Sequence, residues 1–239
     1  EATVSPTGDK IVFTSIRSPD FGAKGVVDRF GQVNPQILIT SNGYSYNGKL
    51  FKLEDKVNGV LEVIDSIEHI VEINYVDIDS TFNHKSVISF DMLLENEGEL
   101  PKFEQLPFDH PLYIMYSSGT TGPPKSIIHS AGGTLIQHMK EHQLHCDIQF
   151  GKSKMFWFTT CGWMMWNWLV SGLSSGATIV LYDGSPSYPN LEKLWKMIDE
   201  LKITHFGTSP KFLSACESNR ILPNKFCQLD SLESILSTG

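Results

Sequence analysis

The part of this chain that decides its fold and its chemistry is one short stretch, Tyr116-Ser117-Ser118-Gly119-Thr120-Thr121-Gly122-Pro123-Pro124-Lys125. It lies between two apolar runs and combines hydroxyl side chains, glycines and a lysine. Glycine lets the main chain approach a ligand closely. Hydroxyl and peptide N–H groups donate hydrogen bonds to anionic oxygens, and lysine adds a mobile positive charge. We therefore predict a polyphosphate-binding loop over residues 117–125, called the 117–125 loop below.

This stretch nearly fits the Walker A loop, G-x-x-x-x-G-K-[ST], which opens a helix. Read from Gly119, however, Pro124 stands where that pattern has its second glycine. Proline has no N–H to donate and pushes the preceding residue toward extended geometry. The next residues, 126–129, are rich in β-branched side chains, so we predict a strand there. A P-loop phosphotransferase, the weaker alternative, requires a helix after Lys125.

The proline that excludes a Walker loop fits another pattern. Residues 117–125 resemble the phosphate-binding motif [YS]-S-S-G-T-T-G-x-P-K of the adenylate-forming enzymes, the superfamily of acyl-CoA synthetases, luciferases and peptide-synthetase adenylation domains. Ser126 departs from it, because glycine commonly follows the lysine. Further segments resemble one family within this superfamily, the acetoacetyl-CoA synthetases. These segments are residues 18–22, 46–49, 129–133, 135–142, 162–168 and 181–186.

The resemblance implies a function. A member of this family is an acid–thiol ligase that activates acetoacetate with ATP through an acyl-adenylate and yields acetoacetyl-CoA, AMP and pyrophosphate. The alternatives are another short-chain acyl-CoA synthetase, such as an acetate–CoA ligase, and a non-catalytic nucleotide-binding or interaction module. ATP and CoA are the implied substrates, and Mg²⁺ is expected to bridge the ATP phosphates. The implied setting is lipid and ketone-body metabolism in the cytosol.

The resemblance also assigns roles to residues. Lys125, Thr120 and Thr121 are the expected catalytic residues, because adenylation must hold and neutralise the ATP phosphates in line with the attacking carboxylate. The expected nucleotide-binding residues are Ser117, Ser118, Gly119, Thr120, Thr121, Gly122, Lys125 and Gly239. The acyl pocket is expected beside an aromatic motif, with Trp163, Met165, Trp166 and Asn167 as its residues. Asn167 is the candidate donor to a ketone oxygen. The alternative for this motif is a core helix with an aromatic stripe.

Histidines near the loop allow two interpretations. His138, His142 and His145 have the spacing of one helix face, which suits a zinc site or a solvated stripe. We expect the solvated stripe and no metal site. His129 follows the loop directly, and it suits either a role in positioning the phosphate region or a structural role.

The composition limits the classes of protein that fit. The chain has 239 residues and 41% hydrophobic content, enough for one sizeable domain or two small ones. A net charge of −8 without any basic run argues against nucleic acid or an anionic membrane as partner. The most apolar stretch, residues 155–170, is shorter than the roughly 20 residues of a bilayer span. Four cysteines without C-x-x-C spacing favour a reducing compartment. For the oligomeric state, we expect a monomer.

Apolar periodicity predicts an alternating α/β fold. Strands are expected over residues 11–14, 36–40, 70–76, 112–116, 126–129, 154–158, 177–182, 204–206 and 234–237. Helices are expected over residues 25–31, 53–66, 133–146, 165–174, 190–201 and 211–218. Such alternation implies mostly parallel, layered sheets flanked by helices. The resemblance implies part of the large N-terminal domain of the adenylate-forming fold, with a front subdomain (1–93), a connector (94–110) and a phosphate-loop subdomain (111–239). The chain reads as the interior of a longer protein whose C-terminal domain is absent here.

Overall fold

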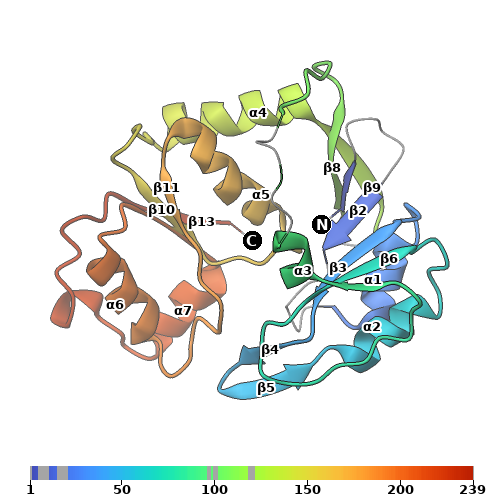
Figure 1. Ribbon diagram of the computed structural model, residues 1–239. Coiled ribbons are helices and arrows are strands. Elements are labelled where there is room, and N and C mark those ends of the chain that lie inside the picture. Colours follow the sequence, from blue (N-terminus) through green and yellow to red (C-terminus); the bar gives the residue numbers. More distant parts are fainter. Residues whose placement is uncertain are drawn as a thin grey trace. The chain divides into compact units, whose positions relative to one another are not determined.

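A computed structural model describes residues 2–4, 11–14, 21–95, 98, 102–117 and 122–238, with the backbone alone in the first two ranges (Figure 1). The chain divides into two compact units. The first unit contains Glu1–Tyr44 and Leu50–Thr134, and the second contains Ser45–Lys49 and Leu135–Gly239. Each unit has its own sheet, so each is described by itself. The predicted connector at residues 94–110 stays a prediction.

The first unit is built on a seven-stranded sheet with the order β7-β6-β3-β2-β1-β8-β9. Its strands are β1 (Ala2–Val4), β2 (Ile11–Thr14), β3 (Ile37–Ser41), β6 (His69–Ile73), β7 (Val87–Ser89), β8 (Pro111–Tyr116) and β9 (Ser126–Ser130). Neighbours from β2 to β7 are parallel, as predicted. The pairs β1–β2, β1–β8 and β8–β9 are antiparallel. Strands β1 and β7 were not predicted, because segments this short carry little periodicity.

Helices α1 (Ala23–Phe30) and α2 (Glu54–Leu61) form the crossovers from β2 to β3 and from β3 to β6. Both crossovers run in the same direction across the sheet, and right-handed connections therefore place both helices on one face; they lie side by side in Figure 1. The predicted helix over residues 53–66 ends earlier. The N–H groups of Val63 and Ile64 both donate to the carbonyl of Val60, so the last turn tightens and stops the helix. Helix α3 (Phe90–Leu94) and the hairpin of β4 (Gly43–Tyr46) and β5 (Lys49–Lys52) were also not predicted.

The second unit has a wholly parallel four-stranded sheet with the order β11-β10-β12-β13. Its elements are helix α4 (Ala131–Lys140, which starts in the first unit), β10 (Lys154–Trp157), α5 (Met164–Ser171), β11 (Thr178–Val180), α6 (Glu192–Leu201), β12 (His205–Thr208), α7 (Pro210–Ser218) and β13 (Ser234–Ser237). The chain passes from β10 to β11 on one side, then returns to β12 and β13 on the other. The connections therefore reverse direction between β10 and β12.

This reversal places the helices on both faces of the sheet, with α5 on one face and α6 and α7 on the other (Figure 1). Side chains alternate along β10, so Met155 and Trp157 pack toward α5 while Phe156 packs toward α6 and α7. Both faces of the strand are buried from Met155 to Trp157, which explains why these three residues are all apolar. Helix α7 begins one residue before the predicted start at Lys211, because Ser209 Oγ accepts from Phe212 N and Pro210 suits the first helical position.

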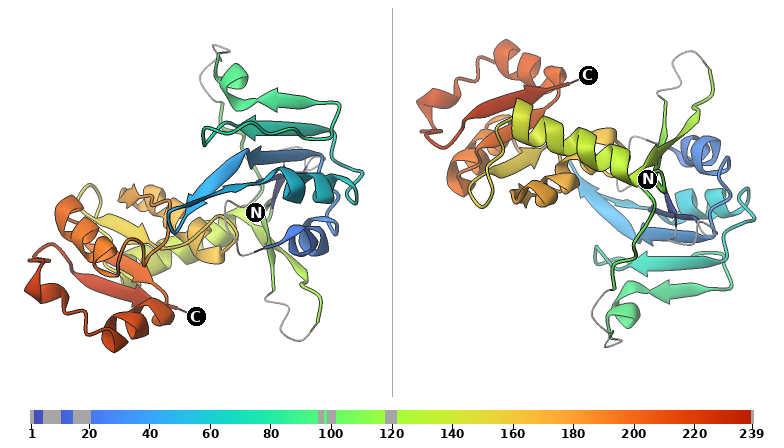
Figure 2. Two further views of the ribbon diagram at one scale, coloured as in Figure 1. Left: turned by 90° about the horizontal axis from the view of Figure 1, so that it is seen from below. Right: turned by 90° about the horizontal axis from the view of Figure 1, so that it is seen from above.

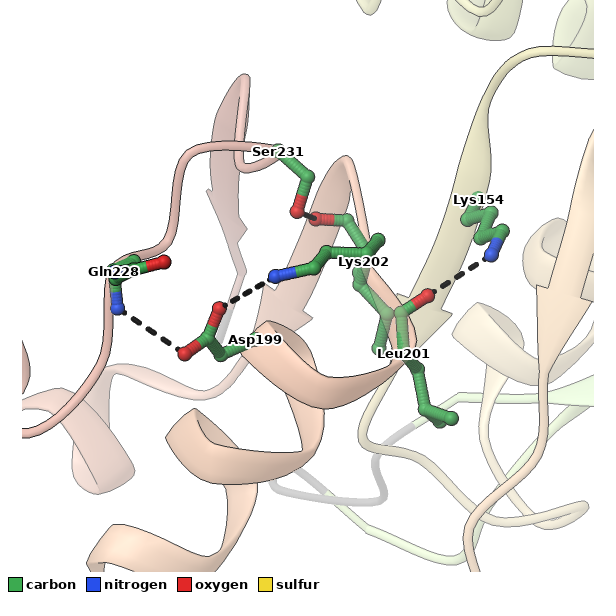
Figure 3. A network of polar contacts seen from close by, with 7 residues as sticks. Lys154, Asp199, Leu201, Lys202, Gln228 and Ser231 are labelled. Atoms are coloured by element: carbon green, nitrogen blue, oxygen red, sulfur yellow. Dashed lines mark hydrogen bonds and ion pairs between the residues drawn. The ribbon is translucent and has the colours of Figure 1, made fainter.

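A polar network fixes the C-terminal end of α6 at the amino edge of this sheet (Figure 3). Lys202 has a left-handed backbone, and its Nζ lies 3.0 Å from Asp199 Oδ1. The N–H of Gln228 donates to Asp199 Oδ2 (3.1 Å), and Lys154 Nζ donates to the carbonyl of Leu201 (3.0 Å). The bond from Lys202, helped by the one from Gln228, lowers the pKa of Asp199. These charged residues are structural, because ligands of parallel sheets bind at the carboxyl edge.

None of the helices in the described ranges is long and apolar enough to cross a membrane.

Candidate functional site

Strands β8 and β9, which flank the 117–125 loop in the sequence, form a hairpin at one edge of the first unit's sheet (Figure 2). Strands β8 and β9 are antiparallel, and Tyr116 pairs with Ser126. The strand predicted after Lys125 is therefore confirmed. The alternative of a P-loop phosphotransferase is wrong, because it requires a helix at this position. The physical reason is that the two prolines and the β-branched residues after them favour extended backbone. Four predicted site residues, Ser118, Gly119, Thr120 and Thr121, lie outside the described residues.

Both described ends of the loop are held by hydrogen bonds. The N–H of Ser117 donates to the carbonyl of Lys125 (3.0 Å), and the N–H of Lys125 donates to Ser117 Oγ (2.9 Å). Gln32 Nε2, at the end of α1, donates to the carbonyl of Pro124 (2.7 Å). Gly122 has a φ of 155°, which side-chain-bearing residues rarely adopt. The loop thus starts and ends at fixed points, and the exposed Lys125 stands at one of them.

Tyr116 precedes the loop and differs from the hydroxyls that follow it. Its ring packs edge-on against Phe30, with ring centroids 5.7 Å apart. Its Oη is buried and has no hydrogen-bond partner among the described residues. Burial raises the pKa of Tyr116 to about 12, although the nearby Arg29 charge acts in the opposite direction. The phenol therefore stays neutral at pH 7 and acts as an anchor of the loop rather than as an acid or base.

The aromatic motif follows β10 at the carboxyl edge of the second unit's sheet. Trp163 is the N-cap of α5 and is 52% exposed, and Met165 and Trp166 are half-buried. Asn167 is only 3% exposed, which places the proposed ketone donor inside the unit. The motif therefore has two parts. Its first turn is accessible to a ligand, as the acyl-pocket prediction requires, and the residues from Asn167 onward belong to the core, as the alternative requires.

The carboxyl edge also contains two threonines that sequence reasoning missed. Thr160 follows β10 and Thr208 ends β12, the two strands between which the connections reverse. Each Oγ1 is buried and has no hydrogen-bond partner in the described part of the chain. An unpaired buried hydroxyl costs about 1–3 kcal/mol, so both point to a ligand or water at this edge. The signal in the sequence was a hydroxyl residue at the end of each buried strand.

The segment that leads to Gly239 also leaves the sheet at this edge. Strand β13 is parallel to β12 and ends at Ser237, so the chain leaves the sheet where the aromatic motif does. Gly239, the residue predicted to contact the nucleotide, lies outside the described residues. The fold thus brings the aromatic motif and the end of β13 to one edge of one sheet, although nearly 70 residues separate them in the sequence.

The three helical histidines do not share one face. His138 and His142 are 8% and 0% exposed, whereas His145 is exposed. The N–H of Cys146 donates to the carbonyl of Glu141, five residues earlier, so Glu141–His145 is a π-turn that rotates His145 away from the other two. The predicted solvated stripe is therefore wrong for His138 and His142. No cluster of three potential metal ligands occurs among the described residues. His129 is exposed on β9.

Burial of His142 predicts a pH-dependent stability. Desolvation and the neighbouring His138 lower the pKa of His142 from 6.5 to about 4, against the opposing effects of its bond to the Trp168 carbonyl and of Glu141. Between pH 6.5 and 4 the unfolded chain therefore binds the proton that the folded one excludes. As the pH falls from 6.5 to 4, we therefore expect the free energy of unfolding to decrease by up to about 3 kcal/mol.

Urea unfolding at pH 7, 6, 5 and 4.5, followed by tryptophan fluorescence, measures this effect. His142→Gln should remove this part of the pH dependence, because glutamine does not titrate. His145→Gln is the matched control, since His145 lies in the same π-turn but is exposed. Equal pH slopes for the wild type and His142→Gln would contradict the assignment.

Comparison with known proteins finds sequence similarity to one enzyme family along nearly the whole chain. The sequence profile of the family described as AMP-binding enzyme matches residues 12–239. The acetoacetyl-CoA synthetase of Gallus gallus is 47% identical over 232 residues, which cover 94% of this chain and 35% of that protein. The malonamoyl-CoA synthetase of Penicillium aethiopicum is 42% identical over 250 residues, which cover 95% of this chain and 34% of that protein.

A solved structure has the same fold. An acetoacetyl-CoA synthetase from Streptomyces lividans superposes with a TM-score of 0.85 at 41% identity, over 92% of this chain and 33% of that one. The α/β fold predicted from the sequence is therefore confirmed. The chain spans about a third of the length of the relatives that it matches.

Proposed function

The chain belongs to the family of AMP-binding enzymes, and from this premise we propose that the complete product of its gene is an acid–thiol ligase that activates acetoacetate. The observation that carries the proposal is the 47% identity to an acetoacetyl-CoA synthetase over 94% of the chain. The hairpin position of the 117–125 loop and the accessible first turn of α5 support it, because they suit a phosphate site and an acyl site respectively.

The proposed reaction has two steps. A carboxylate oxygen of acetoacetate attacks the α-phosphorus of ATP, and the bond to the β-phosphate breaks to release pyrophosphate. The sulfur of CoA, having lost its proton, then attacks the acyl carbon, and the bond to AMP breaks to release acetoacetyl-CoA. The catalytic demand of the first step is to neutralise the phosphates and hold them in line with the nucleophile. Lys125 and the N–H and hydroxyl groups of the 117–125 loop would supply this.

Mg²⁺ fits this scheme as an ion that reaches the site on the ATP phosphates. The described residues offer no cluster of three metal ligands, whereas the 117–125 loop is rich in hydroxyls that suit a hard cation already bound by phosphate oxygens. When bound, the ion would supply charge neutralisation for the leaving pyrophosphate. Lys125 would supply the protein's own share of that charge.

A second candidate substrate is malonamate. The Penicillium aethiopicum relative is a malonamoyl-CoA synthetase, and its similarity covers 95% of the chain. Acetoacetate and malonamate are both short acids with a carbonyl group two bonds from the carboxylate. They differ only in a methyl or an amino group beyond that carbonyl. An acyl site built for one would admit the other unless it distinguishes an apolar end from a hydrogen-bond donor.

ATP–pyrophosphate exchange by the complete gene product distinguishes these candidates. We expect exchange with acetoacetate, at a kcat/KM at least about tenfold above that with acetate or butyrate, because neither of those acids offers the ketone oxygen. Malonamate giving the highest value would favour the second candidate. Exchange with none of the acids would contradict the ligase activity, and equal exchange with acetate would contradict the acid assigned here.

The remaining proposals concern the setting of the enzyme. We propose a monomer in the cytosol that serves ketone-body and lipid metabolism, with small molecules rather than nucleic acid or membranes as partners. The negative net charge supports the exclusion of polyanionic partners. All four cysteines are free thiols, which suits a reducing compartment.

A further inference from the structure

Helix α5 is joined to the end of α4 and to the π-turn by hydrogen bonds of two residues, Trp168 and Ser171. The Trp168 carbonyl accepts hydrogen bonds from His142 Nε2 (3.0 Å) and from Ser171 Oγ (2.8 Å). The Trp168 indole Nε1 donates to Glu141 Oε2 (2.8 Å). His138 Nδ1 lies 2.8 Å from Ser171 Oγ, which extends the network to a second histidine. All of these residues belong to the second unit.

The protons in this network are determined by counting donors. Carbonyls only accept, so His142 Nε2 and Ser171 Oγ must both donate to Trp168. Ser171 has then used its only proton, and His138 Nδ1 must be the donor to it. His142 therefore carries its proton on Nε2, and its Nδ1 is buried without a partner among the described residues. A second proton on Nδ1 would be buried without an acceptor among the described residues, so the His142 imidazole is neutral.

The carbonyl of Trp168 is available because α5 changes its helix type at its end. The N–H of Gly172 donates to the carbonyl of Leu169 instead of that of Trp168, and a 3₁₀-turn follows over Gly172–Ser175. The ordinary partner of the Trp168 carbonyl in an α-helix is thereby withdrawn. On the other side, the spacing of His138, Glu141 and His142 along the helix directs all three toward α5. Gln137 Nε2 donates to Glu141 Oε1 (2.6 Å) and holds that carboxylate in place.

These polar groups lie against the apolar cluster that contains Trp157, Trp168 and Leu169. His142 packs edge-on against Trp168, with ring centroids 4.4 Å apart, and Trp157 also packs edge-on against Trp168, with centroids 5.4 Å apart. Apolar packing holds a helix against its neighbours but permits several similar placements. Hydrogen bonds are directional, so bonds to both the carbonyl and the indole of one residue fix the rotation and the axial position of α5 together.

We propose that Glu141 and His142 are positioning residues for the acyl site. They set the placement of α5 through Trp168, and thereby the placement of its first turn, Met164 to Asn167, one helical turn away. This inference rests on the proposed function, because it takes the first turn of α5 as the acyl side of the site. The expected consequence is selective, since the described ends of the 117–125 loop, Ser117 and Lys125, belong to the other unit and take no part in these hydrogen bonds.

Steady-state kinetics of four variants of the complete gene product test the proposal. His142→Leu and Glu141→Met keep the volume but remove the bond to Trp168. His142→Gln and Glu141→Gln keep, respectively, a donor and an acceptor near the same position. We expect each of the first pair to raise KM for the acid at least about tenfold with KM for ATP unchanged, because small misplacements of a site have large effects. The second pair should lie within about threefold of the wild type.

A purely structural role predicts a different result. It would lower kcat through a smaller active fraction and leave both KM values unchanged, and that result would overturn the proposal. Failure of both glutamine variants to restore the acid KM would also overturn it. Soluble yield and near-ultraviolet circular dichroism show whether each variant is folded, and the milder glutamine pair keeps the comparison possible if a leucine or methionine variant does not fold.

An NMR readout separates this proposal from the proposed function. The indole N–H of Trp168, assigned with Trp168→Phe, should exchange slowly with solvent in the wild type and in Glu141→Gln. It should exchange faster and shift upfield in Glu141→Met. If no acid supports exchange of pyrophosphate while this signal behaves as expected, the contact stands and the ligase function fails. If the signal is the same in Glu141→Met, the positioning contact itself is contradicted.

Discussion

Lys125→Ala is expected to lower kcat/KM for ATP in the complete gene product by about 10²–10³-fold, the usual effect of removing one charge-stabilising group from a transition state. Lys125 stands at the end of the 117–125 loop, where its backbone N–H and its carbonyl both form hydrogen bonds with Ser117. Its backbone is therefore fixed while its side chain is exposed, as a group that reaches a mobile phosphate chain requires. KM for the acid should change little. ATP–pyrophosphate exchange measures both parameters.

Two controls make this result specific. Lys125→Arg keeps the charge and should retain activity within about tenfold of the wild type, because guanidinium also binds phosphate oxygens. Lys193→Ala removes another exposed lysine, from α6 of the second unit, and should have no effect. An Lys125→Ala variant within threefold of the wild type would show that the loop acts through its N–H and hydroxyl groups alone.

Gly207→Ala is expected to lower the free energy of unfolding by about 3 kcal/mol, as overpacking a rigid core does. Gly207 lies in β12 directly beside Trp157 of β10 in the parallel pairing. A methyl group on Gly207 would overlap the Trp157 indole at Cδ2 and Cε3. That ring is buried in the cluster under α5 and packs on Trp168, so it has no room to move.

Gly59→Ala is the matched control for this substitution. Gly59 lies inside α2, and a methyl group there would meet Ala23 Cβ at 3.5 Å, an ordinary contact. Alanine is the better helix former, so this variant should gain about 0.5–1 kcal/mol. Urea unfolding followed by far-ultraviolet circular dichroism measures both variants. Equal stabilities of Gly207→Ala and the wild type would mean that the Trp157 ring does not lie against β12.

The strands on either side of the 117–125 loop were predictable from the sequence because the causes are local. Pro124 removes the N–H that a Walker loop needs, and the β-branched residues after Lys125 extend the chain, so the hairpin β8–β9 follows from the residues themselves. The parallel strands β10 and β12 followed in the same way from short apolar runs between helical patterns. The first turn of α5 was found only through resemblance, because bulky apolar residues alone indicate a core.

Helix α4 shows why the histidine network was not predictable. Periodicity indicates which residues share a helix face, and it then assigns the apolar face to the core. Here Leu135 and Ile136 are 44% and 62% exposed, whereas His138 and His142 are buried. The burial of these histidines depends on partners supplied by α5, nearly 30 residues away in the sequence. No local pattern contains that information.

The sequence by itself determined the extended strands on either side of the 117–125 loop, the α/β alternation and the order of the main elements. Each of these follows from backbone preferences and side-chain periodicity within a few residues. Only the tertiary structure decided which groups meet: the two threonines at the carboxyl edge, the indole of Trp157 over Gly207, and the neutral His142 on the carbonyl of Trp168. The physical reason is that burial and hydrogen bonding depend on distances in space, and the fold sets those distances between residues far apart in the chain.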